Sequence, residues 1–233
     1  MNEPRRIGSL IALEGMDGCG KTLAREYLTH SFIRNGLPAI STHEIGGTPI
    51  GKELRNIAFC KREDETLDPI SRLLLLYASR MQHIRKVIEP AIRNGTHVIT
   101  DRFNDSTRIY QGKIDNLDKQ MDQIEACNPL RMLAARANYV LYFKVDTEIA
   151  FNRGVARKNV DNDTYKNDLT KAELINKSYD NLFLDLYKKS PSSVFVVDAN
   201  KDIPHVKQQL DNFVAMFKSM IQLGRADDDS AII

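Results

Sequence analysis

The sequence predicts one α/β domain built on a five-stranded parallel sheet with helices on both faces. Five short runs rich in branched and aromatic residues alternate with long segments of helical periodicity. A glycine-rich stretch, GMDGCGKT, lies between the first of these runs and a helical pattern. At 233 residues the chain suits a single domain with a sizeable core. Alternation of this kind makes right-handed crossovers, so the loops that follow the strands meet at one functional edge.

The predicted strands are five apolar runs, which we expect to be buried in a parallel sheet. They are GSLIALE, LPAISTH, HVITD, YVLYFKV and SVFVVDA, at residues 8–14, 37–43, 97–101, 139–145 and 193–199.

The helical segments carry apolar residues three and four positions apart, and we expect these faces to cover the sheet. The segment after the glycine-rich stretch has its face at Leu23, Tyr27, Leu28 and Phe32. The longest face consists of Ile70, Leu73, Leu74, Tyr77, Met81, Ile84, Ile88 and Ile92. The last face consists of Val206, Leu210, Phe213, Phe217 and Met220.

The charge balance gives no reason to expect nucleic acid or a membrane as a partner. The chain has 33 basic and 31 acidic residues and a formal charge of +2, so it has no strong overall field. No apolar run approaches the roughly 20 residues that span a bilayer, and the N-terminus lacks the apolar core of a signal peptide.

Cysteine usage favours the cytoplasm. Cys19, Cys60 and Cys127 are far apart and odd in number, which fits neither a disulfide framework nor a zinc cluster. We expect one domain over residues 1–223, followed by a flexible acidic tail at 224–233.

The glycine-rich stretch has the spacing G-x-x-x-x-G-K-[ST] of a phosphate-binding loop. Its glycines let successive backbone N–H groups curl around phosphate oxygens at a helix N-terminus. Lys21 is placed to reach the β and γ phosphates, and the Thr22 hydroxyl to bind the Mg²⁺ that bridges them. The alternative is a chance glycine-rich turn, but the flanking strand and helix favour an ATP site. Its predicted residues are Gly15, Met16, Asp17, Gly18, Cys19, Gly20, Lys21 and Thr22.

A second group of polar residues begins where the third predicted strand ends. Asp101 is placed to hold the Mg²⁺ shell through water, and Arg102 to point into the same cleft. An Asp-Arg pair can also be a structural ion pair. A polar face follows on a helical turn, made of Ser106, Thr107, Tyr110 and Gln111, and it suits a small polar ligand. Arg55 follows the glycine turn HEIGGT, so that Arg55 and Arg102 could hold an acceptor phosphate.

The segment at 153–168 is polar, charged and poor in apolar anchors, which predicts a mobile lid. Phosphoryl transfer needs positive charge around the migrating group, and the glycine-rich loop contains no arginine. Arg153, Arg157 and Lys158 are the candidates to supply that charge. The alternative is an ordinary solvated helix end.

Four motifs in register resemble the thymidylate kinase family over nearly the whole chain. They are EGMDGCGKT, HEIGGT with Leu54-Arg55, LYASR and DRFNDSTRIYQG. The resemblance implies a P-loop nucleoside monophosphate kinase fold with a lid of the bacterial type. It also implies Mg²⁺-dependent transfer of the ATP γ-phosphate to dTMP, for dTTP biosynthesis, by a homodimer.

The resemblance also assigns roles to the acceptor side. Asp17 would bind the deoxyribose 3′-hydroxyl, Arg55 and Arg102 the dTMP phosphate, and Arg80 the thymine O4 edge. Thr107 and Gln111 would meet the base, and Tyr110 would crowd the 2′ position. The full predicted dTMP set is Asp17, Glu44, Arg55, Leu76, Arg80, Arg102, Ser106, Thr107, Tyr110 and Gln111. On the donor side, Asn200 in DAN resembles the adenine-side loop, and Arg153 and Arg157 join Lys21 and Arg102 as catalytic candidates.

The chain departs from the family pattern in several places, including Ala137-Asn138 where the family commonly has Pro-Asp before the fourth strand. His43 stands where the family has arginine, Ile45 where it has proline, and Leu76 where a phenylalanine stacks on thymine. The Asp-Arg pair of the family lid is missing from NDTYKND. The departure at Leu76 predicts looser base selection.

Two other functions remain as alternatives. A nucleoside kinase on the same scaffold would need a general base and no phosphate clamp, whereas Arg55 and Arg102 favour a phosphate acceptor. A nucleotide-gated switch would need a guanine-reading N-K-x-D after a strand, and NKSYD at 176–180 lies within a helical pattern instead. A kinase that accepts a broader range of deoxynucleoside monophosphates is the alternative closest to the main interpretation.

Overall fold

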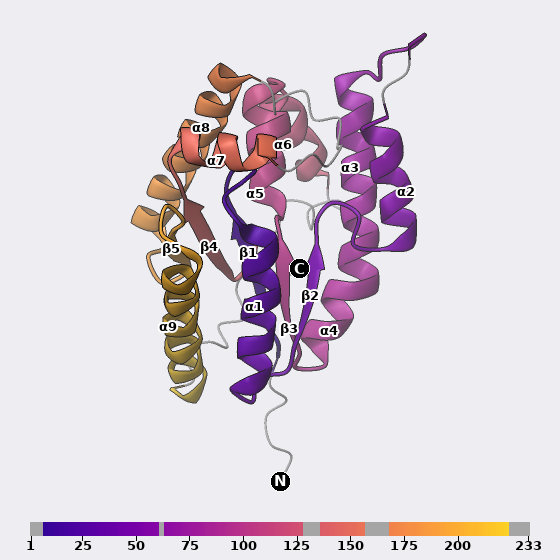
Figure 1. The fold of residues 1–233 in the computed structure, drawn as a ribbon. Helices are drawn as coiled ribbons and strands as arrows, with labels where there is room; N and C mark the ends of the chain where they lie inside the picture. Colours follow the sequence, from indigo (N-terminus) through magenta and orange to yellow (C-terminus); the bar gives the residue numbers. More distant parts are fainter. Residues whose placement is uncertain (1–6, 61–62, 128–135, 157–167, 224–233) are drawn as a thin grey trace.

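The computed structural model describes residues 7–60, 63–127, 136–156 and 168–223, and it contains one five-stranded sheet (Figure 1). The strand order is β2-β3-β1-β4-β5 and every neighbouring pair is parallel. The strands are β1 (Leu10–Glu14), β2 (Ala39–His43), β3 (His97–Asp101), β4 (Tyr139–Lys144) and β5 (Val194–Asp198). The predicted fold class and all five predicted strands are confirmed, with ends that shift by at most two residues.

The helices occupy the segments between the strands. They are α1 (Lys21–Arg34), α2 (Pro49–Ala58), α3 (Pro69–His83), α4 (Glu89–Arg93), α5 (Asn104–Thr107), α6 (Asp118–Ala126), α7 (Thr147–Ala156), α8 (Leu169–Lys189) and α9 (Ile203–Gln222). Two π-helical segments, η1 (Ile84–Ile88) and η2 (Arg108–Ile114), continue α3 and α5 without a break. Within the part of the chain that the structure describes, no helix combines the length and the apolar character needed to cross a bilayer.

Several helices begin at side-chain caps that the sequence supplies. The Thr48 hydroxyl accepts the Gly51 N–H at the start of α2, and Asp68 accepts two N–H groups at the start of α3. Pro49 occupies the first position of α2, where no N–H is needed. Asp168 and Asp202 cap α8 and α9 in the same way.

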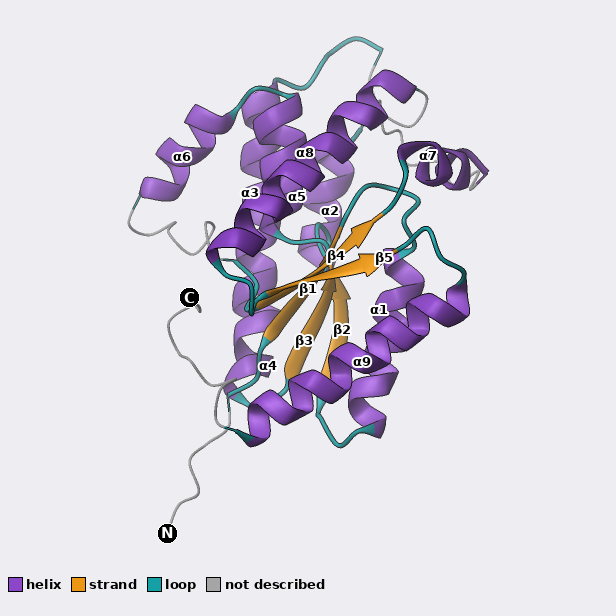
Figure 2. Cartoon of the chain, turned by 90° about the vertical axis from the view of Figure 1, so that its left-hand side faces the viewer, coloured by secondary structure: helices purple, strands orange, loops and turns teal. Residues whose placement is uncertain are grey.

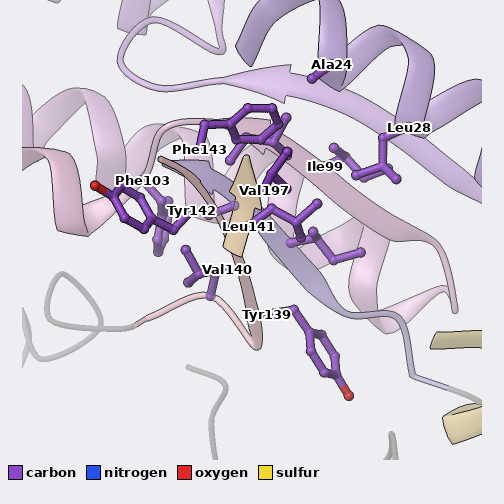
Figure 3. Close-up of a cluster of buried hydrophobic side chains, with 14 of the residues drawn as sticks. Ala24, Leu28, Ile99, Phe103, Tyr139, Val140, Leu141, Tyr142, Phe143 and Val197 are labelled. Carbon is purple, nitrogen blue, oxygen red and sulfur yellow. The ribbon is translucent and has the colours of Figure 1, made fainter. Parts of the chain in front are cut away.

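The sheet is covered on both faces (Figure 2). Helices α1 and α9 pack against each other and cover one face, while α4 and α8 lie on the other. The buried side chains around β4, among them Leu141 and Phe143, form the centre of the core (Figure 3). Each fully buried side chain of this size contributes about 1.5–3 kcal/mol relative to its exposed state. The core therefore fixes the strand ends that carry the site.

The aromatic residues of α8 extend this core toward the site. The ring of Phe183 stacks on that of Tyr142, with centroids 4.7 Å apart, and Tyr179 stacks alongside both. Offset aromatic pairs of this kind add about 0.5–1.5 kcal/mol beyond their buried area. The phenol of Tyr179 is thereby held at a fixed position at the edge of the core.

Two predicted apolar faces need correction. Ile70 and Leu74 are 40% and 50% exposed, because α3 packs against α2 and turns Leu73, Leu76 and Tyr77 inward instead. Leu23 is exposed on α1, where it lines a cavity rather than the core. The face predicted for the last helix is confirmed at its buried centre, Leu210, Phe213 and Phe217.

Parallel pairing brings three loops together at the carboxyl edge of the sheet. Leu13 and His43 both pair with Asp101, so β1, β2 and β3 end side by side. The glycine-rich loop, the turn at 44–48 and the segment from Arg102 therefore leave the sheet next to one another. This edge carries the candidate site.

Candidate active site

The glycine-rich loop has the backbone that its sequence predicts. Gly18 and Gly20 have φ values of +85° and +96°, which residues with a Cβ rarely adopt. A Cβ on Gly18 would lie 2.0 Å from the carbonyl oxygen of Ala150, so the loop also needs glycine for its contact with α7. Gly20 leads directly into α1, whose first N–H groups and dipole favour an anion.

Lys21 is held over this loop. Its Nζ donates hydrogen bonds to the carbonyl oxygens of Gly15 and Met16, at 2.9 and 2.8 Å, and the side chain is buried. A buried ammonium group beside the start of a helix is a strong local source of positive charge. The structure thus places Lys21 where a phosphate chain on the loop would meet it.

Thr22 and Asp101 come together as predicted. The Thr22 hydroxyl donates a hydrogen bond of 2.9 Å to Oδ2 of Asp101, across the gap between α1 and the end of β3. Magnesium prefers oxygen ligands and keeps several waters, so one hydroxyl and one carboxylate beside a phosphate loop match its needs. The predicted Mg²⁺ residues therefore fit that ion.

Arg102 is held at the site by several hydrogen bonds. Its backbone has a φ of +69°, and its guanidinium donates to Asp17 at 2.7 Å and to Ser106 and Tyr179 at 2.8 Å. Burial alone would lower the pKa of Arg102, but Tyr179, Tyr110 and Asp17 raise it above its ordinary value. Arg102 therefore stays charged at any pH at which the protein works.

A cavity opens between Arg102 and helices α2 and α3. All of the residues predicted for dTMP line it: Asp17, Glu44, Arg55, Leu76, Arg80, Arg102, Ser106, Thr107, Tyr110 and Gln111. Ile45, Phe59 and Phe103 complete its walls. In Figure 1, α2 and α3 lie on the far side of β2 from α1, while Asp17 brings the glycine-rich loop to the same cavity. We name it the acceptor cavity.

Arg80 and Glu44, which both line the acceptor cavity, form a buried ion pair, and His83 contacts the second oxygen of Glu44. Arg80 Nε donates to Glu44 at 2.6 Å, and its other N–H groups bond Asn104 and Thr107 at 2.8 and 2.6 Å. Burial would raise the pKa of Glu44, but Arg80 and His83 lower it below its ordinary value. Both Glu44 oxygens bond these two partners, so Glu44 supports Arg80 at the wall of the acceptor cavity.

The last residue of β2, His43, and Ile45 in the turn that follows are two of the departures from the family pattern. Arg55 Nη1 donates to the carbonyl oxygen of Ile45 at 3.2 Å, so the turn still holds this arginine at the cavity. Burial and the nearby Arg25 and Arg55 lower the pKa of His43, so it is neutral at pH 7. His43 therefore does not replace the charge of the arginine that the family has there.

Leu76 faces the acceptor cavity from α3 with little of its surface exposed. Phe59 faces the same cavity from the end of α2, and the guanidinium of Arg55 lies 5.5 Å from the centre of its ring. Phe59 was missed from the sequence. Its position four residues after Arg55, on the same helical face, is the signal that could have identified it.

A second and larger cavity, of about 630 Å³, opens on the other side of the glycine-rich loop. Gly18, Cys19 and Gly20 form one wall, and α1, α9 and the loop after β5 form the others. Arg153 lies in the last turn of α7 and donates a hydrogen bond of 2.9 Å to the carbonyl oxygen of Ala199 at this cavity. A cavity of this size accommodates a drug-sized ligand such as a nucleoside.

The remaining residues predicted for the ATP side are Asn200 and those of the lid. Asn200 accepts a hydrogen bond from the Asp146 N–H at 2.8 Å, which joins the loops after β4 and β5. Arg157, Lys158 and most of the predicted lid at 153–168 lie outside the described residues.

Two buried side chains behind Arg102 were also missed. Glu14 at the end of β1 and Tyr179 in α8 both belong to the hydrogen-bond network around Ser106. Glu14 directly precedes the glycine-rich loop, which is a signal of proximity, but nothing in the sequence shows that Tyr179 reaches this network.

Comparisons with known proteins agree on one family. The family model described as "Thymidylate kinase" matches residues 13–210. A thymidylate kinase of Francisella tularensis subsp. novicida is 34% identical over 86% of this chain and 92% of its own length. Those of Pseudomonas fluorescens and a Marinomonas species are 33% and 34% identical, over 94% and 89% of this chain and 99% and 94% of theirs. The matched region contains strands β2 to β5, the end of β1 and the residues that line both cavities.

Proposed function

The chain belongs to the thymidylate kinase family, and from this premise we propose that it transfers the γ-phosphoryl group of ATP to dTMP, yielding ADP and dTDP for dTTP biosynthesis. One observation carries the proposal beyond membership of the family. The phosphate loop with Lys21 and the acceptor cavity with Arg102 open side by side at one edge of the sheet. Donor and acceptor phosphates would therefore meet between these two cations.

The chemistry needs positioning and charge more than covalent help. A phosphate oxygen of dTMP attacks the γ-phosphorus of ATP, the bond to the β–γ bridging oxygen breaks, and ADP leaves. The attacking phosphate is already an anion, so no general base is required. The nucleoside kinase alternative would need such a base at the 5′-hydroxyl.

Three side chains carry the proposed transfer. Lys21 and Arg102, whose side chains are largely buried, would stabilise the charge that develops on the migrating group. Asp17 binds Arg102 in the structure and would bind the 3′-hydroxyl of dTMP, which orients the sugar next to the same arginine.

Mg²⁺ would be held by Thr22 and, through water, by Asp101, beside the phosphate loop. It would neutralise charge on the β and γ phosphates. The Thr22–Asp101 hydrogen bond aligns these two oxygens from separate elements.

We assign ATP to the glycine-rich loop and the second cavity. The residues from Gly15 to Thr22 would bind its phosphates, and the cavity beside Arg153 would bind its base. Arg153, Arg157 and Lys158 remain predicted lid residues, with Asn200 supporting the base-side loop.

On the acceptor side, Arg55 and Arg102 would grip the dTMP phosphate and Tyr110 would crowd the 2′ position. Thr107 accepts its hydrogen bond from Arg80, so its own hydroxyl proton can serve the base. Gln111 and Ser106 line the same wall.

The test of this function is ADP release over a panel of deoxynucleoside monophosphates, ribonucleoside monophosphates and thymidine. We expect dTMP to be turned over fastest and thymidine to be inert. If thymidine were turned over and dTMP were not, the result would support the nucleoside kinase instead.

Leu76→Phe is expected to tighten selection of the base. A ring stacked on a base adds about 0.5–1.5 kcal/mol, so the KM for dTMP should fall roughly 2- to 12-fold. The ratio of kcat/KM for dTMP over dUMP should rise as well, because a ring defines the plane of the base more sharply. Steady-state kinetics on dTMP, dUMP, dGMP and dCMP measures both quantities.

The matched control is Leu184→Phe, which adds the same ring at an exposed position of α8, outside both cavities. It should leave the base preference of the wild type unchanged. If Leu76→Phe changes neither the KM for dTMP nor the ratio, Leu76 does not contact the base.

We further propose that the protein is a homodimer, and that exposed apolar side chains on α2 and α3 form its interface. Ile50 and Ile57 lie seven residues apart on α2, and Ile70 and Leu74 four apart on α3, and all of them are exposed. Ile57→Glu should shift the dimer to monomer, because it places a charge in an apolar contact. Light scattering after size-exclusion chromatography measures the mass, with Leu184→Glu on α8 as the control that remains dimeric. A wild type that is monomeric at all concentrations would contradict the proposal.

A further inference from the structure

A fully buried carboxylate lies directly behind Arg102. Glu14, the last residue of β1, has no exposed surface. Its Oε1 accepts the Phe103 N–H at 2.7 Å and more weakly the Ser106 N–H at 3.4 Å, and its Oε2 accepts the Ser106 hydroxyl at 2.6 Å. Glu14 therefore binds the backbone on the C-terminal side of Arg102 at two points.

These contacts stabilise an unfavourable backbone. A residue with a Cβ at a φ of +69°, as at Arg102, persists only where its surroundings hold it. The Leu13 carbonyl accepts the Arg102 N–H at 3.0 Å, and Glu14 accepts the next N–H in the chain. The end of β1 thus holds the turn that presents the guanidinium.

The side chains form a directed chain of hydrogen bonds. Arg102 donates to Ser106 and to Tyr179, and the Ser106 hydroxyl gives its single proton to Glu14. The Tyr179 hydroxyl must then donate to Ser106, which lies 2.8 Å away. The chain begins at a cation and ends on Glu14 as an acceptor, so its direction requires an ionised carboxylate.

From this arrangement we propose that Glu14 is a positioning residue for phosphoryl transfer. Its carboxylate, acting through Ser106 and the Phe103 N–H, holds the guanidinium of Arg102 where it meets the acceptor phosphate. Only the identity of the acceptor rests on the function proposed above.

The charges around Glu14 show that this arrangement has a cost in stability. Burial and the nearby Asp105 raise the pKa of Glu14 to about 7, while Arg102, the Ser106 hydroxyl and the Phe103 N–H lower it only in part. The charged and titratable groups that face Glu14 are Arg102 from the segment after β3, Asp105 from α5 and Tyr179 from α8. Because the pKa lies above its ordinary value of 4.5, the folded state loses stability as the pH rises from there to about 7. Glu14→Gln should remove this loss, so its Tm at pH 8 should equal or exceed that of the wild type.

The decisive experiment is a double-mutant cycle in the full chain with Glu14→Gln, Arg102→Ala and the double variant. Residues in one hydrogen-bond network are coupled by up to a few kcal/mol, so Glu14→Gln alone should lower kcat about 10-fold. In the Arg102→Ala background the same change should lower kcat by less than about 2-fold, because the group that Glu14 positions is gone. The KM for ATP should not change in either background.

A pH profile gives the second readout. The kcat of the wild type should fall as the pH drops below about 7 and Glu14 gains a proton, and Glu14→Gln should lack this fall. If Glu14 served only in packing, Glu14→Gln would leave the fall of kcat at low pH unchanged.

The matched control is Glu125→Gln. Glu125 is also a buried carboxylate, bonded to the Tyr77 hydroxyl and to Arg108 outside the acceptor cavity. This variant should lower Tm, and its effect on kcat should be the same with and without Arg102.

Equal effects of Glu14→Gln on kcat in both backgrounds, or a lower Tm with unchanged kcat, would overturn the proposal. If Glu14→Gln does not fold, Ser106→Ala breaks the same chain and enters the cycle in its place. If the wild type uses another nucleoside monophosphate, only the proposed substrate is overturned. The double-mutant cycle is then run with that acceptor and still tests the role of Glu14. A wild type inactive on all of them overturns both.

Discussion

Lys21→Ala is expected to lower kcat by roughly 10²-fold or more while the chain stays folded. Lys21 is a buried cation whose ammonium group bonds the Gly15 and Met16 carbonyl oxygens above the phosphate loop. Charge developing on the γ-phosphoryl group would meet this buried ammonium, and burial strengthens the interaction between charges. Steady-state rates of ADP release measure the loss, and circular dichroism checks the fold.

The matched control for this prediction is Lys113→Ala. Lys113 is largely exposed and pairs with Asp118 at the surface, so its removal should leave kcat within about 2-fold of the wild type. A Lys21→Ala variant with near wild-type turnover and unchanged Tm would show that Lys21 does not contact the migrating phosphate.

Arg102→Ala is expected to lower kcat by roughly 10²-fold or more and to raise the KM for dTMP. Its guanidinium donates to Asp17, Ser106 and Tyr179 at the acceptor cavity, so one change removes the proposed phosphate ligand and frees Asp17 from this ion pair. Arg102→Lys should recover only part of the activity, because lysine restores the charge without the planar fork of donors. Kinetics with dTMP as the varied substrate separates the two constants.

Arg85→Ala is the control for Arg102. Arg85 forms an exposed i,i+4 pair with Glu89 and should be dispensable for turnover. If Arg102→Lys were as active as the wild type, any charge at this point would suffice and the bidentate grip on phosphate would be excluded.

The strands and the phosphate loop could be predicted because their signals are local. Buried parallel strands appear as short apolar runs, and a loop with positive φ values at Gly18 and Gly20 requires glycine in the sequence. The α3 face was harder to predict, because periodicity says that a helix has an apolar face but not what that face meets. Ile70 and Leu74 are exposed because α3 packs on α2 and on the acceptor cavity rather than only on the sheet.

Part of the site could be predicted because several of its residues belong to one sequence motif. Arg102, Ser106, Tyr110 and Gln111 lie within ten residues, and the structure brings them to one cavity. Tyr179 could not be predicted, since it reaches Arg102 across 77 positions of sequence through the packing of α8. Glu14 is next to the loop in sequence, but its role depends on the segment after β3, which only the parallel pairing of β1 and β3 brings near.

The central claim is that a phosphate, not a hydroxyl, accepts the γ-phosphoryl group of ATP. The most direct measurement follows ³²P from [γ-³²P]ATP into products separated by chromatography, with dTMP and thymidine offered in parallel. We expect labelled dTDP from dTMP, no labelled dTMP from thymidine, and, with Lys21→Ala, labelled dTDP at no more than about a hundredth of the wild-type rate. Label that appears in dTMP when thymidine is offered, with none in dTDP when dTMP is offered, would contradict it.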